Sequence, residues 1–481
     1  MMQDVLESRA SQLLITAVLA VPLAVAITLM KPGLGEMLAL GLIVLLVAFL
    51  FPLTGLYLIV VSMLLGPEFE IGSGQLGAGA QFARGLTLRL DDFLMVLVGS
   101  AWLAKVAVVR QGVQYLQTPL NRAIAYYLGA SILATLIGVL FGRVRPFAGF
   151  FFLLKYYEYF FLYFMTVNLV TDEKQVRQLV TVSLATCFLV SLFAIFQMAH
   201  GERASAPFEG KEGEPNTLGG YLVFMLSIMT GLLVVPGAFR RRGVLIMVLL
   251  CGFVALQATL SRSSYLAAAV VVMVFLVYIS RQRPLLMTLM IFAVLATPLW
   301  APKSVQDRVL YTFTQKAQEG EQIKIGGVKV DTSTTDRLRS WQQAVKAWTT
   351  SPLWGLGVTG GPFMDAMYPK LLADVGILGL VAFGYLMWSL FRLARSGLEE
   401  VDDPYFKGII TGFLFGFVGM LIHGIGANTF IIVRIMEPFW LYAALIAKVL
   451  HLRTKKSVPA KQESSRPEMA RRVASWGSTP A

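Results

Sequence analysis

Cysteine and histidine, the side chains that most often form disulfides and hold transition metals, are scarce in this sequence. It has 2 cysteines and 3 histidines in 481 residues. Cys187 and Cys251 both lie inside apolar runs, which indicates buried thiols and argues against a disulfide framework. The sequence contains no HExxH or CxxC pattern, no acidic metal cluster and no Ser-His-Asp order. It therefore predicts no metal and no acyl-enzyme chemistry.

Charged residues are also few, at 14% of the chain, whereas 56% of the residues are hydrophobic and the mean hydropathy is +0.68. This balance excludes an ordinary soluble domain and predicts an all-α integral membrane protein with several spans. We expect about 12 to 14 transmembrane helices from apolar windows of roughly 19 residues. The candidate spans lie at roughly 11–30, 36–50, 53–66, 91–108, 121–141, 147–170, 177–198, 217–235, 243–259, 264–280, 284–301, 369–392, 406–424 and 430–450.

The net charge of +13 could suggest a nucleic-acid partner, but the basic residues fall in short loops and in the tail. The positive-inside rule places such segments in the cytoplasm, so we expect no nucleic acid. Applying this rule to the successive spans puts both termini on the cytoplasmic side. The segments expected on the outer face are Pro67–Leu90, His200–Asn216, the turn at Arg262 and Ala301–Tyr368.

The sequence divides into four parts. Residues 1–300 are expected to form a transmembrane bundle, 301–368 an extracytoplasmic loop, 369–450 the last transmembrane helices, and 451–481 a disordered basic tail. Within the loop, IKIGGVK alternates like a short hairpin. Thr334 and Thr335 precede apolar residues at helical spacing up to Trp348, which predicts a capped amphipathic helix that lies at the membrane surface or covers the bundle.

Ionisable residues beside apolar runs need a partner, a wet cavity or access to the interface. Arg262, with Ser261 and Ser263 beside it, either snorkels at a helix end or binds a phosphate through its guanidinium fork. Lys155 and Glu158 are three residues apart on one helical face. They are expected to form an intramembrane ion pair, with binding as the other option.

Other polar residues give weaker signals. Arg145 in FGRVRPF faces outward in the threading above, so it is a secondary candidate for an anion contact. GLGVTG at 355–360 fits G-x-G-x-x-G, but an amphipathic helix precedes it and Pro362 follows, which excludes a dinucleotide fingerprint. His423 shares the outer membrane end with Arg434 and Glu437. It is either a packing residue or a member of a site.

Four segments together resemble the O-antigen ligase and O-antigen polymerase superfamily of bacterial membrane glycosyltransferases. They are RLDDFLMVLVGSAWL, EPNTLGGYL, LSRSSYLAA, and the run RLRSWQQAVKAWTTSPLWGLGVTGGPF with YPKLLADVGILGL after it. The resemblance covers about Leu90 to Trp440. It implies a GT-C-like helical bundle in the bacterial cytoplasmic membrane, with an active site that faces the periplasm or the exterior.

The resemblance also implies a chemistry. Arg262 and Arg337 would bind the pyrophosphate of a polyprenyl-linked glycan donor, and we add Ser261, Ser263 and Arg434 to these contacts. The donor is already activated, so no cofactor, nucleotide sugar or metal is expected. The expected partners are this lipid-linked glycan, the bilayer and other polysaccharide assembly proteins.

The sequence departs from the family at the general base. Ligase members often carry a histidine just before the last motif, where this chain has Asp365 instead. Either Asp365 takes this role or His423 reaches in from the following spans. The difference favours a polymerase of a surface polysaccharide or exopolysaccharide. The alternatives are a ligase that transfers the glycan to lipid A core or another acceptor, and a lipid-linked oligosaccharide transporter, although the sequence shows no internal repeat.

Overall fold

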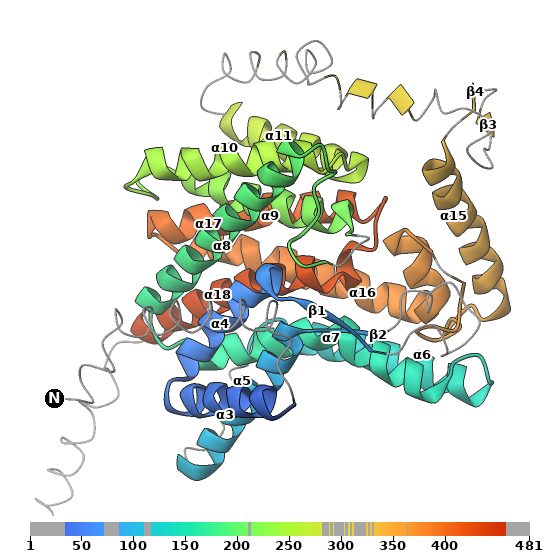
Figure 1. The fold of residues 1–481 in the computed structure, drawn as a ribbon, viewed down its shortest axis with the longest axis horizontal. Coiled ribbons are helices and arrows are strands. Elements are labelled where there is room, and N and C mark those ends of the chain that lie inside the picture. The colour runs from blue at the N-terminus through green and yellow to red at the C-terminus, as the bar shows by residue number, and fades with distance from the viewer. Residues whose placement is uncertain are drawn as a thin grey trace, which may run out of the picture.

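The computed structural model describes residues 34–71, 86–109, 117–209, 213–280, 331–362 and 364–457, with isolated residues between 288 and 329. These residues are almost entirely helical (Figure 1). The helices are α3 (Leu34–Leu50), α4 (Pro52–Leu65), α5 (Leu90–Val109), α6 (Asn121–Leu140), α7 (Pro146–Leu169), α8 (Glu173–Ala199), α9 (Pro215–Val234), α10 (Arg242–Ala258), α11 (Arg262–Ser280), α15 (Thr332–Thr350), α16 (Met367–Glu400), α17 (Pro404–His423) and α18 (Val433–Ser457), with the 3-10 helix η3 (Thr429–Ile431).

Two antiparallel hairpins accompany the helices. Strand β1 (Glu68–Ile71) pairs with β2 (Leu86–Arg89), and β3 (Lys324–Ile325) pairs with β4 (Val328–Lys329). The second hairpin confirms the alternation read in IKIGGVK. The first hairpin lies in a segment where the sequence indicated only a loop, and it positions Arg89 at the start of α5.

The helices confirm the predicted class, an all-α integral membrane protein. Seven helices in the described residues are long and apolar enough to cross a membrane, and α3, α4 and α10 contribute shorter apolar segments. Two expected spans, at roughly 11–30 and 284–301, and the tail 451–481 lie wholly or largely outside the described residues. The count of 12 to 14 spans and the division into four parts stay predictions.

Different segments meet at the two ends of the bundle, and which end faces the cytoplasm stays a prediction. At one end, contacts join the start of α9, the start of α11, α15 and the segment before α16 to the end of α17 and the turn after it. At the opposite end, Arg177 pairs with Asp403 at 2.6 Å and Arg453 approaches Glu173 at 3.7 Å. Phe239 also stacks on Tyr405 there. The basic loop 240–242 therefore lies far along the bundle from Arg262.

Among the described helices, α9 and α17 pack against each other most extensively, and glycine residues allow their backbones to approach closely. A Cβ on Gly231 would lie 2.3 Å from the carbonyl oxygen of Gly408 and 2.4 Å from the amide nitrogen of Gly412. Small residues allow this backbone approach in membrane proteins. Because α9 begins next to Asn216 and α17 ends at His423, the pair brings these two side chains to the same end of the bundle.

Helix α16 is broken at Gly376, which has a positive φ of 61°. The connection that precedes α16 in the chain packs against the break and satisfies its backbone. The amides of Ile377 and Leu378 donate to the carbonyls of Pro352 and Leu353. In return, the carbonyls of Ala373 and Asp374 accept from Leu356 and Gly357. The sequence did not indicate this break, because apolar residues continue on both sides of Gly376.

Candidate functional site

The turn at residues 424–428, between α17 and η3, is the meeting point of the candidate site. The Nε of Arg337 donates to the carbonyl oxygen of Gly426 at 3.1 Å. The amide of Met367 donates to the carbonyl of Gly424 at 3.1 Å. Three segments far apart in the sequence, namely α15, the start of α16 and the end of α17, are therefore joined here.

Arg262 is the first residue of α11, and its partner is Asp331, the residue that caps α15. The Nη2 of Arg262 lies 2.5 Å from Oδ2 of Asp331, and the Asp331 side chain also accepts from the amide of Thr334. Burial opposes ionisation of Asp331, but the hydrogen bonds from Arg262 and Thr334 outweigh it and hold the pKa of this carboxyl below its usual range. The amphipathic helix is confirmed. Its cap is Asp331 and not the predicted Thr334 or Thr335.

Ser263 and Arg337 flank the same glycine. A Cβ placed on Gly426 would lie 3.1 Å from Cβ of Ser263 and 3.6 Å from Nε of Arg337. Arg262, one residue before Ser263, is tied to α15 through Asp331, and Arg337 lies on α15 itself. The two arginines predicted to bind pyrophosphate are thus held at one end of the bundle by the same short helix.

A chain of hydrogen bonds runs behind these arginines through buried hydroxyls. Ser261 Oγ donates to Oδ1 of Asn216 at 2.7 Å and lies 2.7 Å from Oγ of Ser264. Ser264 Oγ lies 3.1 Å from Nε2 of His423, and Nδ1 of His423 lies 2.7 Å from Oγ1 of Thr429. Both ring nitrogens of the fully buried His423 therefore have protein partners. This geometry makes His423 a residue that positions other groups.

Asp365 lies in the bend just before α16 and is half-buried. Its chain neighbours hold the backbone against the turn 424–428. The carbonyl of Met364 accepts from Nδ2 of Asn428 at 2.7 Å, and the amide of Met367 donates to Gly424. The backbone on both sides of Asp365 is therefore bonded to the turn that Arg337 contacts.

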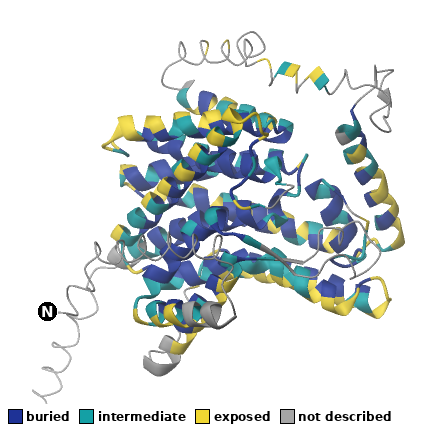
Figure 2. Ribbon diagram, viewed as in Figure 1, coloured by how far each residue is buried: buried dark blue, intermediate teal, exposed yellow. Residues whose placement is uncertain are grey.

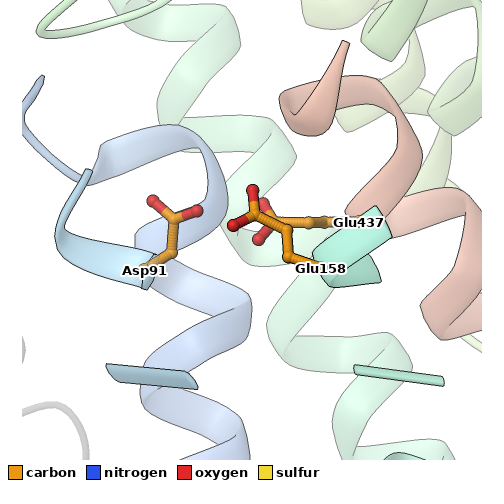
Figure 3. A group of neighbouring side chains, drawn as sticks. All are labelled: Asp91, Glu158 and Glu437. Atoms are coloured by element: carbon orange, nitrogen blue, oxygen red, sulfur yellow. The ribbon is translucent and has the colours of Figure 1, made fainter. Parts of the chain in front are cut away.

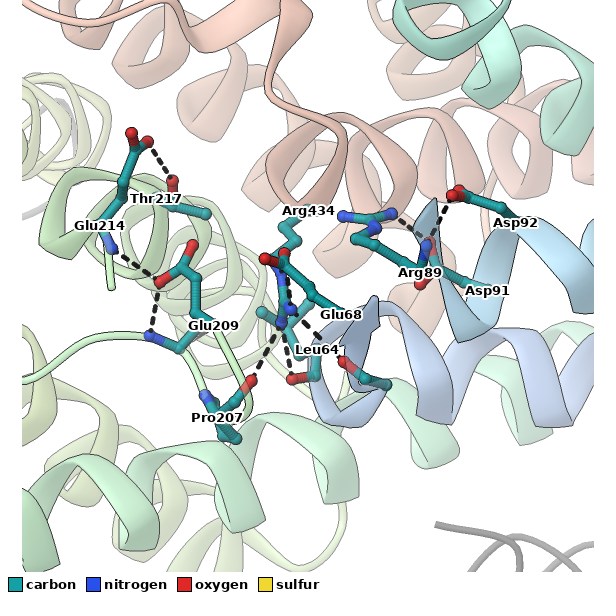
Figure 4. A network of polar contacts seen from close by, with 12 residues as sticks. Leu64, Glu68, Arg89, Asp91, Asp92, Pro207, Glu209, Glu214, Thr217 and Arg434 are labelled. Carbon is teal, nitrogen blue, oxygen red and sulfur yellow. Dashed lines mark hydrogen bonds and ion pairs between the residues drawn. The ribbon is translucent and has the colours of Figure 1, made fainter. Parts of the chain in front are cut away.

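Three other predicted residues belong to a separate ionic network. The Nζ of Lys155 lies 2.5 Å from Oδ1 of Asp92 and 3.2 Å from Oε1 of Glu158. The expected intramembrane ion pair is present, and it has Asp92 as a third member. Arg434 is buried and donates to the carboxylate of Glu68 at 3.0 Å. It also donates to the carbonyls of Leu64, Gly66 and Pro207 (Figure 4).

Arg434 was predicted to bind pyrophosphate, but its surroundings are those of a structural arginine. Its guanidinium hydrogens are directed to one carboxylate and three carbonyls, so a ligand would have to displace them. Glu209 lies in the same loop region and accepts from the amides of Ala206 and Glu214. Burial raises the pKa of Glu209 to about 7, although the charge of Arg434 acts to lower it.

Carboxylates from three helices converge beside this network. One ligand oxygen each from Asp91, Glu158 and Glu437 lies within 4.8 Å of the others (Figure 3). The sequence showed no such cluster, because its members are dispersed along the chain. Arg89 is directed into the group: it is bonded to Asp91, its Nη2 lies 3.0 Å from Glu437, and it approaches Glu158 at 3.9 Å. The positive charge that these carboxylates face is therefore a guanidinium, and we assign no metal to them.

Arg145 is exposed at the start of α7, next to buried Val144. Val144 packs against the glycine-rich turn 355–360, since a Cβ on Gly357 would lie 2.8 Å from its Cγ2. Within this turn the amide of Val358 donates to Oγ1 of Thr135. The amides of Gly355, Leu356, Gly357 and Gly360 donate to backbone carbonyls. These amides hold α6 and α16 together and are not directed at an anion.

Several residues of the site were not singled out from the sequence. Asp331 had a readable signal, because an aspartate just before a helical pattern is a favoured N-cap residue. Asn216 lay inside a quoted motif without an assigned role. Arg89 begins a quoted motif and Glu437 was named beside His423, but the sequence did not indicate that they pair, because they are 348 residues apart.

The fold and the site define a class: a multi-pass helical membrane protein with paired arginines at one end of its bundle. Residues 246–376 match the family model described as O-Antigen ligase. This match confirms the resemblance to the O-antigen ligase and polymerase superfamily. It spans Arg262, Arg337 and Asp365 and ends at the break in α16, while His423 lies beyond it. No curated protein matches the chain.

Proposed function

We propose that this protein is a membrane glycosyltransferase that moves a glycan from a polyprenyl-pyrophosphate donor to an acceptor sugar on the outer side of the bacterial cytoplasmic membrane. The observation that carries this proposal is that Ser263 and Arg337 flank Gly426 while Arg262 is bonded to Asp331, the cap of the helix that carries Arg337. Guanidinium groups and hydroxyls match the oxygens of a pyrophosphate.

Before the donor binds, Arg262 forms an ion pair with the carboxylate of Asp331, at 2.5 Å. A pyrophosphate that arrives at Arg262 competes with this carboxylate, and its larger charge favours the exchange. Arg262 and Arg337 would then stabilise the negative charge that develops on the leaving pyrophosphate, in a geometry set before the substrate binds.

In the transfer step, the acceptor hydroxyl oxygen forms a bond to the anomeric carbon of the donor sugar. The bond from this carbon to the pyrophosphate oxygen breaks, and its electron pair leaves with the polyprenyl pyrophosphate. The hydroxyl proton passes to a general base. We assign this role to Asp365, because His423 has both ring nitrogens bonded to buried hydroxyls whereas Asp365 is a half-buried carboxylate beside the turn 424–428.

The reaction is expected to need no cofactor, metal or nucleotide sugar, since the donor carries its own leaving group. We favour a polymerase of a surface polysaccharide or exopolysaccharide. This choice rests on the absence of histidine from the sequence of residues 301–368. A ligase that transfers the glycan to lipid A core or another acceptor uses the same arginines. Other polysaccharide assembly proteins are the expected partners.

A transporter of lipid-linked oligosaccharide is the second candidate, and one observation favours it. Broken helices line the substrate sites of many transporters, and α16 is broken at Gly376. Transporters usually carry such breaks in pairs, and in the described residues α16 has the only non-helical residue recorded inside a long helix. The enzyme remains the better explanation of the arginine pair.

One assay separates these functions. Purified protein in liposomes is supplied with lipid-linked repeat units, and the products are sized on a gel. Products of many repeats identify a polymerase, and transfer to a different acceptor identifies a ligase. Movement of the lipid-linked glycan across the bilayer without any covalent product would overturn the enzymatic proposal.

A further inference from the structure

Helix α15 presents two different faces, and the larger apolar side chains are on the outer one. Ala344 and Ala347 are buried and pack with Met364 and Ala373. The exposed fraction of Trp341 is 42% and that of Val345 is 49%. At 3.6 residues per turn, positions 338, 341, 345 and 348 share one side of the helix. Of the apolar stripe that predicted this helix from sequence, Trp341 and Val345 are therefore directed away from the protein, Leu338 and Trp348 are half-buried, and Ala344 is buried.

The remaining side of α15 is polar. Gln342, Gln343 and Lys346 are exposed and lie on the side of the helix away from the tryptophans. The helix thus has a protein face, an apolar face and a polar face. Figure 2 shows α15 at the margin of the molecule, with exposed residues along its outer side.

The apolar face of α15 continues into the outer surface of the transmembrane bundle. Leu353, which follows α15, is 52% exposed, and its carbonyl accepts from the amide of Leu378 in α16. Leu378 and Val381 are themselves exposed on α16, at 42% and 64%. Because α16 is one of the helices that can cross a membrane, its exposed apolar side chains face lipid. Leu353 therefore links the exposed apolar residues of α15 to this surface.

We propose that α15 lies in the headgroup region of the bilayer, with Trp341, Val345 and Leu353 inserted among the lipids and Gln343 directed to water. Amphipathic helices with tryptophan on the apolar side bind membranes in this orientation, and tryptophan is enriched at the membrane interface. The occupant of this face is the bilayer that already surrounds α16. A second protein chain would leave the continuity with Leu378 unexplained.

This placement has a consequence for the donor site, which rests on the proposed function. Arg337 lies on α15 one turn before Trp341, so the depth of the helix fixes the height of its guanidinium. A helix held at the headgroup level keeps Arg337 and Asp331 at the level where the pyrophosphate of a polyprenyl lipid emerges. The bilayer thereby helps to set the geometry of the site.

The test measures the surroundings of single positions in the full chain. In a background with Cys187→Ala and Cys251→Ala, which removes both free cysteines, Trp341→Cys and Gln343→Cys are each labelled with a small bimane fluorophore. The proteins are placed in phosphatidylethanolamine and phosphatidylglycerol vesicles with acyl chains brominated near the headgroup. We expect brominated lipid to quench position 341 at least about twice as strongly as 343, and aqueous iodide to show the reverse order.

Val345→Cys provides a second position on the same face in case Trp341→Cys does not fold. Equal quenching by iodide at 341 and 343, or protection of 341 from both quenchers, would overturn the proposal, because the face would then meet water or protein. The measurement uses no glycan. Quenching by lipid together with a failed transfer assay would leave the position of α15 standing and remove only the proposed function.

Discussion

Two arginine-rich regions lie at the same end of the bundle, yet they are built in opposite ways. In the ionic network, Arg89, Lys155 and Arg434 face five carboxylates, those of Glu68, Asp91, Asp92, Glu158 and Glu437. At the turn 424–428, Asp331 holds Arg262, while Arg337 donates to a carbonyl and lies beside Ser263.

This difference separates structural arginines from arginines that can bind. A buried guanidinium surrounded by carboxylates has its charge matched by the protein, and an anionic ligand would be repelled. A guanidinium beside hydroxyls and a carbonyl retains attraction for an anion. Intramembrane charge alone therefore does not identify a site. In the described contacts, five carboxylates face three cations in the network, whereas Asp331 is the carboxylate that faces the arginines at the turn.

The largest effect is expected when Arg89, the central cation of the ionic network, is removed. Arg89→Ala leaves Asp91 and Glu437 buried without their cation, so we expect the free energy of unfolding to fall by about 3 to 5 kcal/mol. Chemical denaturation in detergent measures it. The matched control is Arg395→Ala, which removes an exposed helical pair with Glu399 and should change stability little. Equal losses in the two variants would show that Arg89 is not a structural centre.

At the turn 424–428 we expect substitutions to lower activity more than stability. Arg262→Ala and Arg337→Ala should each lower glycan transfer by about 10² to 10³ fold, because each removes a charge aimed at the leaving pyrophosphate. Their unfolding free energy should fall less than that of Arg89→Ala. Lys346→Ala, an exposed cation on α15, is the control and should keep its activity. Full activity in Arg262→Ala would remove that residue from the donor site.

The two candidate bases can be ranked by pH dependence. Asp365→Asn should lower transfer by at least about 10² fold and abolish the loss of activity on the acid side of the pH profile. His423→Asn should lower kcat by roughly 10 fold and leave the shape of the profile unchanged, because His423 only positions Ser264 and Thr429. A profile that loses its acid side in His423→Asn would reverse the assignment.

The smallest effect concerns the resting pair of Arg262 and Asp331. The pKa of Asp331 is lowered on folding, so its contribution to stability is present above the carboxyl's ordinary pKa and disappears as the pH falls through the lowered value. Asp331→Asn should cost about 1 kcal/mol at neutral pH through the weakened cap and lost pair. It should also make acid unfolding less steep. Identical acid titrations of unfolding in the variant and the parent would contradict this account.

The sequence predicted the helices of the bundle well, because each is a long apolar run bounded by polar or helix-breaking residues, such as Pro52, Pro146 and Pro404. It also predicted that Arg262 and Arg337 belong together, through motifs that resemble a family. It could not predict how the charges pair. Lys155 was joined to Glu158 by helical spacing, but Asp92 comes from another helix and only the packing reveals it.

The break at Gly376 went unseen for a related reason. Hydropathy reports whether a segment prefers lipid, and the residues on both sides of Gly376 do. The positive φ and the hydrogen bonds from 352–357 depend on a neighbouring segment, so they leave no periodic trace in α16 itself. The same limit applies to the hairpin of β1 and β2, whose pairing depends on residues that are distant in sequence.

That break has a consequence for how the chain enters the membrane. The 34 residues of α16 would measure about 51 Å as one straight helix, well beyond a hydrocarbon core of about 30 Å. The part after Gly376 measures about 36 Å and matches that thickness with a modest tilt. This part can insert first, as an independent span. The shorter part, with Lys370 and Asp374 paired at 2.9 Å, then docks once the 352–357 connection supplies its hydrogen bonds.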